Sequence, residues 1–292
     1  MGQTTDGLPA VRITTPDVAS ASSSAAPSRE ILGMRVDATS YDAATSLVLE
    51  WAAARRSRAV AVATVNNVME SYDDPSYREV MNAADLVTPD GMPLVWGLRR
   101  LGIGAATRVY GPDLTPVVLD AAERAGIEVG FYGSSPEVLD ALLARIGSAY
   151  PALKVVYATS PPFGDVGDEE DAETVRAING SGCRILFVGL GCPKQERWIV
   201  QHRGRVDAVM LGVGAAFDFL AGTKRQAPAV MQRAGLEWLF RLGTEPRRLW
   251  RRYLRHNPRF VVLFARQLLR GEGSRPNDVR PSASSSSEME GS

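Results

Sequence analysis

The residues in this chain best suited to chemistry are two carboxylates in or beside glycine-containing turns. Asp90 lies in residues 88–93 (Thr-Pro-Asp-Gly-Met-Pro), where proline stiffens the turn and glycine permits close approach of a ligand. Asp218 ends a second glycine-rich stretch, residues 212–218. A carboxylate held in a rigid turn can act as a general base. Because Pro-Asp-Gly turns are also common in proteins without catalytic activity, the motif alone does not decide the role of Asp90.

Polar side chains also follow an apolar segment early in the chain. Thr64 lies near the end of the apolar run 59–65, and Asn66 comes next. A hydroxyl and an amide here could hydrogen-bond a sugar, although asparagine is equally a favoured helix cap. Arg108 precedes a tight turn at residues 111–113, and a guanidinium binds diphosphate oxygens through paired hydrogen bonds. An ordinary surface arginine is the alternative for Arg108.

Two glycine turns have the composition of an anion site. Gly133 and Ser134 follow one apolar run and precede a proline-started helix, and Gly191 and Lys194 follow another. Free backbone N–H groups and the positive end of a helix dipole attract a phosphate at such positions. Neither segment has the full Gly-x-Gly-x-x-Gly spacing, which disfavours a nicotinamide-dependent dehydrogenase. We therefore expect these four residues, together with Asp218, to contact a substrate.

These residues can act together only if the fold brings them to one edge of a sheet. The hydropathy pattern predicts such a sheet. Short β-branched runs alternate with amphipathic helical windows, which predicts a doubly wound, largely parallel α/β sheet of Rossmann type with a C-terminal helical appendage. In such sheets, ligands bind outside the carboxyl ends of the strands. The predicted strands are 59–65, 128–132, 154–157, 185–190 and 209–213, and the predicted helices are 114–125, 136–150, 171–179 and 193–202.

Composition divides the chain into four parts. Residues 1–29 and 271–292 are rich in small and polar residues that cannot offset chain entropy by burial, which predicts disordered tails. Residues 30–234 are the predicted α/β catalytic domain. Residues 235–270 are a predicted basic, amphipathic helical appendage, in which Pro258 is expected to separate two helices.

The overall composition excludes several classes of protein. The 292 residues carry 33 basic and 33 acidic side chains, so no net charge attracts the whole molecule to nucleic acid or membrane. Two cysteines and two histidines are too few for a disulfide scaffold or a His-rich metal centre, and no Asp-x-Asp pair is present to hold a divalent ion on a diphosphate. We therefore expect neither a metal nor another cofactor. The absence of an apolar run of about 20 residues favours a soluble protein of the reducing cytoplasm.

Arginine is concentrated near the C-terminus. Seven arginines stand against one acid, Glu245, between residues 241 and 259, and aromatic side chains are interleaved with them. This pattern is typical of helices that lie on a membrane surface, and nucleic-acid binding is the competing interpretation. The apolar stretch after residue 259 favours lipid. We expect this region to meet an anionic membrane surface and Arg241, Arg248 and Arg251 to bind substrate, with no nucleic-acid partner.

Weak motifs recur in order along the predicted folded body. They are Ile31-Leu32-Gly33, Asn66, Pro89-Asp90-Gly91, Arg108 with Gly111 and Asp113, Gly133, Gly189-Leu190-Gly191, Pro193-Lys194-Gln195-Glu196, residues 214–218, Gly235-Leu236-Glu237-Trp238 and Arg241. Together they resemble the WecG/TagA/CpsF glycosyltransferases of bacterial cell-surface polymer synthesis. The resemblance implies an inverting, metal-independent hexosyltransferase. Its donor would be a UDP-linked sugar such as N-acetylmannosamine or its uronic acid, and its acceptor an undecaprenyl-diphosphate-linked saccharide.

The resemblance also implies roles for particular residues. The aspartate of the Pro-Asp-Gly turn would be the general base, and Arg108 would meet the diphosphate. Thr64, Asn66 and Gln195 would bind or orient substrate. The basic appendage would associate with the membrane and complete the site, which implies a peripheral protein at the inner face of the cell membrane. The sequence departs from the family at residues 160–164, where members often carry a Gly-Tyr or Gly-Phe turn.

Two other classes of protein stay open at this point. A non-catalytic nucleotide- or nucleic-acid-binding protein would use the arginine-rich helices and bind in a salt-dependent way. A dehydrogenase would bind a nicotinamide cofactor. The sequence does not determine the donor sugar, the acceptor saccharide or the oligomeric state, and a homo-oligomer is left open.

Overall fold

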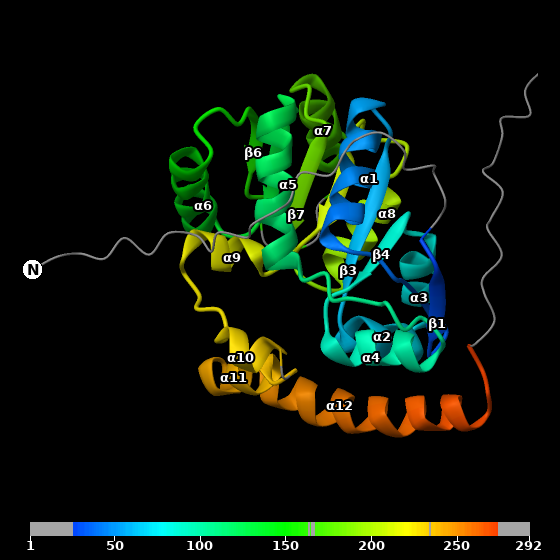
Figure 1. Ribbon diagram of the computed structural model, residues 1–292. Coiled ribbons are helices and arrows are strands. Elements are labelled where there is room, and N and C mark those ends of the chain that lie inside the picture. Colours follow the sequence, from blue (N-terminus) through cyan, green and yellow to red (C-terminus); the bar gives the residue numbers. More distant parts are fainter. Residues whose placement is uncertain (1–25, 163, 165–166, 234, 274–292) are drawn as a thin grey trace, which may run out of the picture.

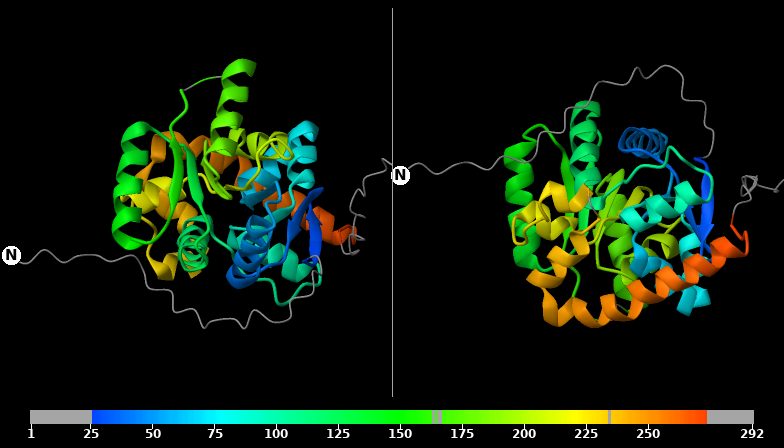
Figure 2. Two further views of the ribbon diagram at one scale, coloured as in Figure 1. Left: turned by 90° about the horizontal axis from the view of Figure 1, so that it is seen from above. Right: turned by 60° about the horizontal axis from the view of Figure 1, so that its bottom comes forward.

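The computed structural model describes residues 26–162, 164, 167–233 and 235–273, and its centre is a six-stranded parallel sheet (Figure 1). The strand order is β4-β3-β8-β7-β5-β6, with every neighbouring pair parallel. The strands are β3 (Arg58–Ala63), β4 (Leu86–Pro89), β5 (Val129–Gly133), β6 (Val155–Thr159), β7 (Ile185–Gly189) and β8 (Val209–Gly212). Helices cover both faces of the sheet (Figure 2), so the prediction of a doubly wound, Rossmann-like α/β fold with C-terminal helices is confirmed.

Each of the five predicted strands corresponds to a strand of this sheet, but β4 was not predicted. It has four residues and ends at Pro89, so in the sequence it is indistinguishable from the start of a turn. Proline is tolerated because β4 is an edge strand that pairs on one side with β3. Asp90 therefore follows a strand directly, at the carboxyl edge of the sheet.

Helices cover the two faces of the sheet, and several of them begin at a side-chain N-cap. One face carries α1 (Tyr41–Ala53), α5 (Gly111–Ala125), α6 (Pro136–Ala149) and α9 (Ala216–Ala221), and the other α2 (Val65–Asp73), α3 (Pro75–Ala83), α7 (Asp168–Gly180) and α8 (Lys194–Gln201). The Ser40 hydroxyl accepts a hydrogen bond from Ala43 N at 3.1 Å and begins α1. The Asp74 carboxylate accepts from Ser76 N at 2.9 Å and begins α3. Both are the expected N-cap chemistry.

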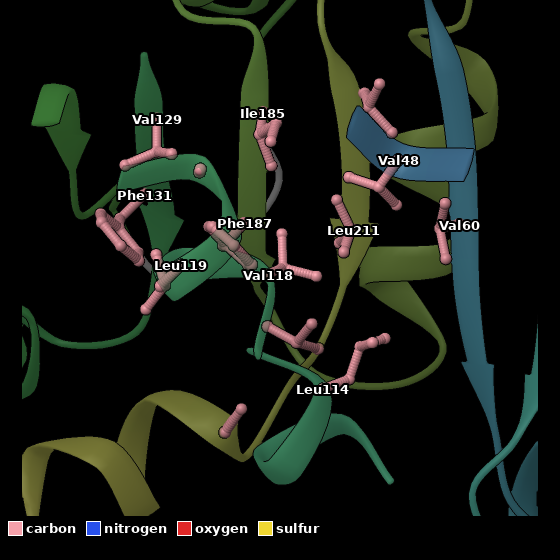
Figure 3. Close-up of a cluster of buried hydrophobic side chains, with 14 of the residues drawn as sticks. Val48, Val60, Leu114, Val118, Leu119, Val129, Phe131, Ile185, Phe187 and Leu211 are labelled. Carbon is pink, nitrogen blue, oxygen red and sulfur yellow. The ribbon is translucent and has the colours of Figure 1, made fainter. Parts of the chain in front are cut away.

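The strand alternation sends side chains to two separate cores. In β7, Ile185 and Phe187 point to the layer of α1, α5, α6 and α9, whereas Leu186 and Val188 point to the opposite layer. Figure 3 shows the first of these cores. There Phe131 stacks on Phe187 with 5.3 Å between the ring centroids. Burying each such ring stabilises the fold by roughly 1.5–3 kcal/mol.

A short hairpin precedes the sheet and was not predicted. Strands β1 (Ser28–Ile31) and β2 (Met34–Asp37) pair through a turn at Leu32 and Gly33, both with positive φ. β1 begins two residues before the predicted start of the folded body at residue 30. Asp37 ties the hairpin to β4 by accepting a hydrogen bond from Val87 N at 2.7 Å. Burial raises the pKa of the Asp37 carboxyl to about 6.

The C-terminal helices pass beneath this body (Figure 1). They are α10 (Ala229–Arg233), α11 (Glu237–Thr244) and α12 (Pro246–Leu269), and α12 lies along α2 and α4 (Met92–Arg100). Gly97 of α4 permits the approach, since an added Cβ would lie 3.3 Å from Phe264 Cζ. None of the helices that the structure describes is long and apolar enough to span a lipid bilayer.

The long helix α12 is pinned at several points and continues through Pro258. The two terminal nitrogens of the Arg259 guanidinium, Nη1 and Nη2, donate to the Asp73 carboxylate at 2.8 and 2.7 Å. At the far end, the Gln267 amide nitrogen donates to Glu30 O at 2.7 Å and its oxygen accepts from Leu32 N.

The expectation of a helix break at Pro258 is wrong, because α12 continues through this residue. Pro258 is exposed, so water can satisfy the carbonyl that the proline leaves without a donor.

Candidate active site

Asp90 is held at the carboxyl edge of the sheet by contacts on both sides of its carboxylate. Its backbone N–H donates to Ala63 O at 2.9 Å, which continues the β3–β4 pairing by one residue. Its Oδ2 accepts a hydrogen bond from Gly111 N at 3.4 Å, at the start of α5. Its side chain is 13% exposed. The carboxylate is therefore fixed by the backbone but open to a ligand.

Arg108 joins Asp90 to the C-terminal helices. Its Nε donates to the backbone carbonyl of Asp90, and its Nη2 lies 3.4 Å from Asp90 Oδ1. The same Nη2 lies 2.6 Å from Oε2 of Glu237, the first residue of α11. The guanidinium also sits 4.1 Å from the ring centroid of Tyr110. One arginine thus bridges two carboxylates from distant parts of the chain.

The surroundings prepare Asp90 to exchange a proton near neutral pH. Burial raises the pKa of its carboxyl to about 6, because removing water disfavours the charged form. The Arg108 charge opposes this rise, and the nearby Glu237 charge adds to it. A base whose pKa lies slightly below the working pH is mostly deprotonated and still basic enough to accept a proton.

Arg241 contributes a second cation from α11. Burial lowers the pKa of its guanidinium, but the nearby Tyr253, Tyr110, Glu237 and Asp90 raise it, and the net shift is upward. Its guanidinium lies 5.6 Å from the centroid of the Phe219 ring, and its Nε has no hydrogen-bond partner in the described part of the chain. A buried polar atom without a partner costs about 1–3 kcal/mol. A bound anion would remove that cost.

A cavity of about 560 Å³ lies beside this cluster. Its wall contains Asp90 and Arg108 from the body, and Glu237 and Arg241 from α11. Most of the remaining wall comes from α4 and α12, with a smaller part from the start of α2 and from the segment around α11, and many of its residues are apolar. The α/β body and the C-terminal helices together therefore form the cavity.

Of the residues after β3, Asn66 faces the cavity with a free acceptor. Its amide nitrogen donates to Cys192 Sγ at 3.2 Å, and its Oδ1 is buried with no partner among the described residues. Thr64 also lines the cavity, but its hydroxyl donates to Asn67 Oδ1 at 2.8 Å. The two interpretations of this segment, a helix cap and a substrate contact, therefore apply to different residues. Thr64 and Asn67 form a capping box, and Asn66 is available to a ligand.

Gln195 does not line this cavity. It is 4% exposed, its Oε1 accepts from Gly191 N at 3.2 Å, and its Nε2 donates to Glu196 Oε1 at 2.9 Å. Asn67 also donates to Glu196 Oε1, at 3.2 Å. Gln195 therefore supports the turn after β7, and hydrogen bonds through Glu196 and Asn67 connect it to Thr64 of the cavity wall.

The other predicted contacts from the body gather at the ends of β5, β7 and β8, outside the cavity wall. A Cβ at Gly133 would lie 2.6 Å from the carbonyl carbon of Gly189, so only glycine permits this close approach. Ser134 N donates to Gly189 O at 2.9 Å. Lys194 Nζ donates to the carbonyl of Gly164, and Asp218 pairs with Lys224 at 3.4 Å. Gly191 lies in the same turn as Lys194.

The predicted arginines of α12 have different environments. Arg251 is exposed, lies against the Trp250 ring at 5.3 Å and is not part of the cavity wall. Arg248 belongs to α12, but its side chain lies outside the part that the structure describes. Arg255 and Arg259 both pair with Asp73, so they anchor the helix.

The cavity wall also includes Glu237, Arg252 and His256, which were not among the predicted site residues. His256 is 5% exposed, and its Nδ1 has no partner in the described region. Arg252 Nε is likewise buried without a partner. The spacing of four residues between them could have indicated a shared helix face.

The histidines do not form a metal site in the described part of the chain. His202 Nε2 lies 2.7 Å from Asp171 Oδ1 and its ring stacks on Trp198, so it has a structural role. Across the described residues, no three His, Cys, Asp or Glu side chains cluster in a way that could hold a metal ion.

A buried carboxylate with two arginines at the carboxyl edge of a parallel sheet is an arrangement suited to a phosphorylated substrate. The chain belongs to the glycosyl transferase WecG/TagA/CpsF family, whose family model matches residues 29–274. It is similar to a Bacillus spizizenii protein named N-acetylglucosaminyldiphosphoundecaprenol N-acetyl-beta-D-mannosaminyltransferase, at 32% identity over 194 residues, 66% of this chain and 73% of the relative.

A Staphylococcus aureus protein of the same name is 27% identical over 240 residues, which are 81% of this chain and 92% of the relative. The family resemblance is therefore confirmed, and the chain is a glycosyltransferase. This assignment favours the enzyme over the nucleic-acid-binding protein and the dehydrogenase.

Proposed function

We propose that the enzyme transfers an N-acetylmannosamine-type sugar, or its uronic acid, from a UDP-linked donor to a polyprenyl-diphosphate-linked saccharide. The names of the relatives support this acceptor and this sugar. The observation that carries the proposal is the position of Asp90. This carboxylate is partly buried, accepts a hydrogen bond from Gly111 N and pairs with Arg108 on the wall of an open cavity.

In the proposed reaction, Asp90 removes the proton from the acceptor hydroxyl. The hydroxyl oxygen attacks the anomeric carbon of the donor on the face opposite UDP. The new carbon–oxygen bond forms as the bond to the diphosphate oxygen breaks, and UDP leaves with the bonding electrons. The configuration at the anomeric carbon is therefore inverted. Asp90 then returns its proton to water, which its pKa of about 6 allows at neutral pH.

The charge that develops on UDP is neutralised by cations of the chain. Arg108 and Arg241 flank Asp90, and a guanidinium binds a diphosphate through paired hydrogen bonds. No Asp-x-Asp pair is present to hold a divalent ion there, so we propose a metal-independent reaction. Asn66 Oδ1, which has no described partner, accepts a hydrogen bond from a sugar hydroxyl, and Thr64 lies beside it.

The turns at the ends of β5, β7 and β8 are proposed to hold the rest of the donor. Ser134 and Gly133 precede the N-terminus of α6, and Gly191 and Lys194 precede or begin α8. Helix N-termini attract phosphate, and Lys194 adds a charge. Asp218 offers a carboxylate to sugar hydroxyls. Gln195 positions the turn and does not touch substrate.

We place the enzyme at the inner face of the cell membrane, held by α12. The outward face of this helix exposes Trp250 and Leu254 beside Arg247 and Arg251. Aromatic, aliphatic and basic side chains on one helix face favour attachment to anionic lipid.

A donor screen tests the proposed function. The full chain is incubated with individual UDP-sugars and a polyprenyl-diphosphate-linked N-acetylglucosamine in detergent micelles, and UDP release and the lipid-linked disaccharide are measured. We expect UDP-N-acetylmannosamine or its uronic acid to give the fastest turnover, with an inverted anomeric configuration by NMR. No release with any donor would overturn the proposal. Activity that EDTA abolishes and Mg²⁺ restores would contradict the metal-independent step.

A further inference from the structure

The cavity-facing side of α12 changes from polar to apolar along its length. Residues 252, 256, 260, 264 and 268 recur at intervals of four and all line the cavity. Arg252 and His256 come first, and Phe260, Phe264 and Leu268 follow. At 1.5 Å per residue, this series spans about 24 Å.

In the polar part of this series, one nitrogen of Arg252 and one of His256 lack hydrogen-bond partners in the described part of the chain. Arg252 Nε and His256 Nδ1 are buried, and neither bonds to any described residue. No described carboxylate pairs with Arg252, unlike Arg108, which has Glu237, and Arg259, which has Asp73. A buried donor in this state is a site for an anion or another acceptor.

The apolar part of the series forms one wall of the cavity. Phe260 is 5% exposed and stacks on Phe264 with 5.7 Å between the ring centroids. Trp96 of α4 faces the same cavity and is 48% exposed. Leu268 extends the apolar wall towards the end of α12.

The proposed reaction brings two diphosphates into one site, one on the donor and one on the lipid-linked acceptor. We propose that Arg252 and His256 bind the acceptor's diphosphate and that Phe260, Phe264 and Leu268 hold the first isoprenoid units. Arg108 and Arg241, which surround Asp90, are left for the donor. The polar-to-apolar order favours the acceptor because a lipid diphosphate has this order and a UDP-sugar has no apolar tail. This inference rests on the proposed function for the identity of the acceptor.

The test separates the two substrates by steady-state kinetics in detergent micelles. The acceptor is supplied with either a full polyprenyl chain or a methyl group, which has no isoprenoid unit, on the same diphosphate saccharide. We expect Arg252→Ala and His256→Ala to raise the KM of both acceptors by at least about tenfold, as for loss of a charged hydrogen bond, with the donor KM changed less than about twofold. Phe264→Ala should raise the KM of the full-chain acceptor alone.

Matched variants guard against effects on folding. Arg266→Ala, an exposed arginine of the same helix outside the cavity wall, should leave both KM values unchanged. Arg252→Lys and His256→Asn keep a donor near the same place and should recover part of the acceptor affinity. Thermal unfolding of each variant confirms that it is folded.

The inference is overturned if folded Arg252→Ala and His256→Ala leave the acceptor KM unchanged, or raise the donor KM as much as the acceptor KM. Calorimetric titration of the full-chain acceptor in micelles, without donor, gives the same comparison independently of turnover. If the wild type binds this acceptor through Arg252 but uses no UDP-sugar, the proposed function fails and the acceptor site stands. Equal binding by wild type and Arg252→Ala in that titration overturns the site.

Discussion

In the α/β body, Phe131 and Phe187 are fully buried against the sheet, whereas in α12 Leu254 and Val261 expose 67% and 65% of their surface. Polar groups show a related contrast. Asp90 has hydrogen-bond donors on both sides, but Arg252 and His256 of α12 have buried nitrogens without described partners. The body is thus stabilised by its own core, and the carboxylate of Asp90 already has hydrogen-bond partners within the protein. The C-terminal helix leaves groups that a lipid surface and a substrate can satisfy.

The first prediction compares the loss of stability when one core ring is removed with the loss when one exposed side chain is removed. Phe131→Ala deletes a ring that contacts both Phe187 and Phe217, so we expect a loss of about 3–5 kcal/mol in the free energy of unfolding. Leu254→Ala should change it by no more than about 0.5 kcal/mol. Urea unfolding followed by circular dichroism measures both. Similar losses in the two variants would show that α12 is packed as the body is.

The second prediction concerns the carboxylate that the body presents. Asp90→Asn keeps the shape of the side chain but removes the base, and we expect kcat to fall about 100-fold or more. Asp120→Asn is the matched control, since Asp120 lies on the surface of α5 and pairs with Arg124. Kinetics with a verified donor and acceptor make the test. Near-normal kcat in Asp90→Asn would exclude Asp90 as the base and make Asp218 the next candidate.

Much of the body could be predicted from its sequence because its elements are regular. Buried strands such as residues 185–189 are continuous apolar runs that lie between helical segments. The edge strand β4 was missed because it runs into the Pro-Asp-Gly turn. The β1–β2 hairpin was missed because its four-residue strands mix charged with apolar side chains. The position of Asp90 nevertheless followed from the Pro-Asp-Gly turn.

The site was harder to predict where it depends on packing between distant elements. Glu237 lies 129 residues from Arg108, and no local pattern indicates that the two side chains meet. Gln195 is in a motif that suggests substrate contact, yet its amide is used within the protein. No local pattern in the sequence marks His256 as a site residue, because its place on the cavity wall comes from the docking of α12 on the body.

The third prediction tests whether the outward face of α12 meets lipid. Arg247 and Arg251 are exposed, and each surface-apposed arginine contributes about 1 kcal/mol of attraction to an anionic leaflet. The double substitution to alanine should therefore weaken binding to anionic vesicles by about 2 kcal/mol, or roughly 30-fold, at low salt. Co-sedimentation at low and high salt measures this loss. A double variant of Arg56 and Arg176, both exposed on the body, should bind like wild type, and equal binding by both double variants would remove the membrane role of α12.

The smallest expected effect is at Glu237, where the two regions touch. Burial and the Glu237 charge raise the pKa of Asp90 to about 6, against the opposing charge of Arg108. As the pH falls through this value, Asp90 is protonated and kcat/KM is lost, so the acid limb of the profile has its midpoint near pH 6. Glu237→Gln removes one negative charge and leaves Arg108 less compensated, which lowers the pKa of Asp90. We therefore expect the midpoint to move to lower pH.

The pH profile distinguishes this electrostatic role from a merely structural one. A loss of packing at Glu237 would lower kcat/KM at every pH without moving the midpoint. Glu272→Gln is the control, because Glu272 is an exposed carboxylate beyond α12 that pairs with Arg270. Glu237→Asp keeps the charge and should keep the midpoint near that of the wild type. A midpoint in Glu237→Gln that stays in place or rises would show that the C-terminal helices do not tune the base, and that Glu237 only holds Arg108.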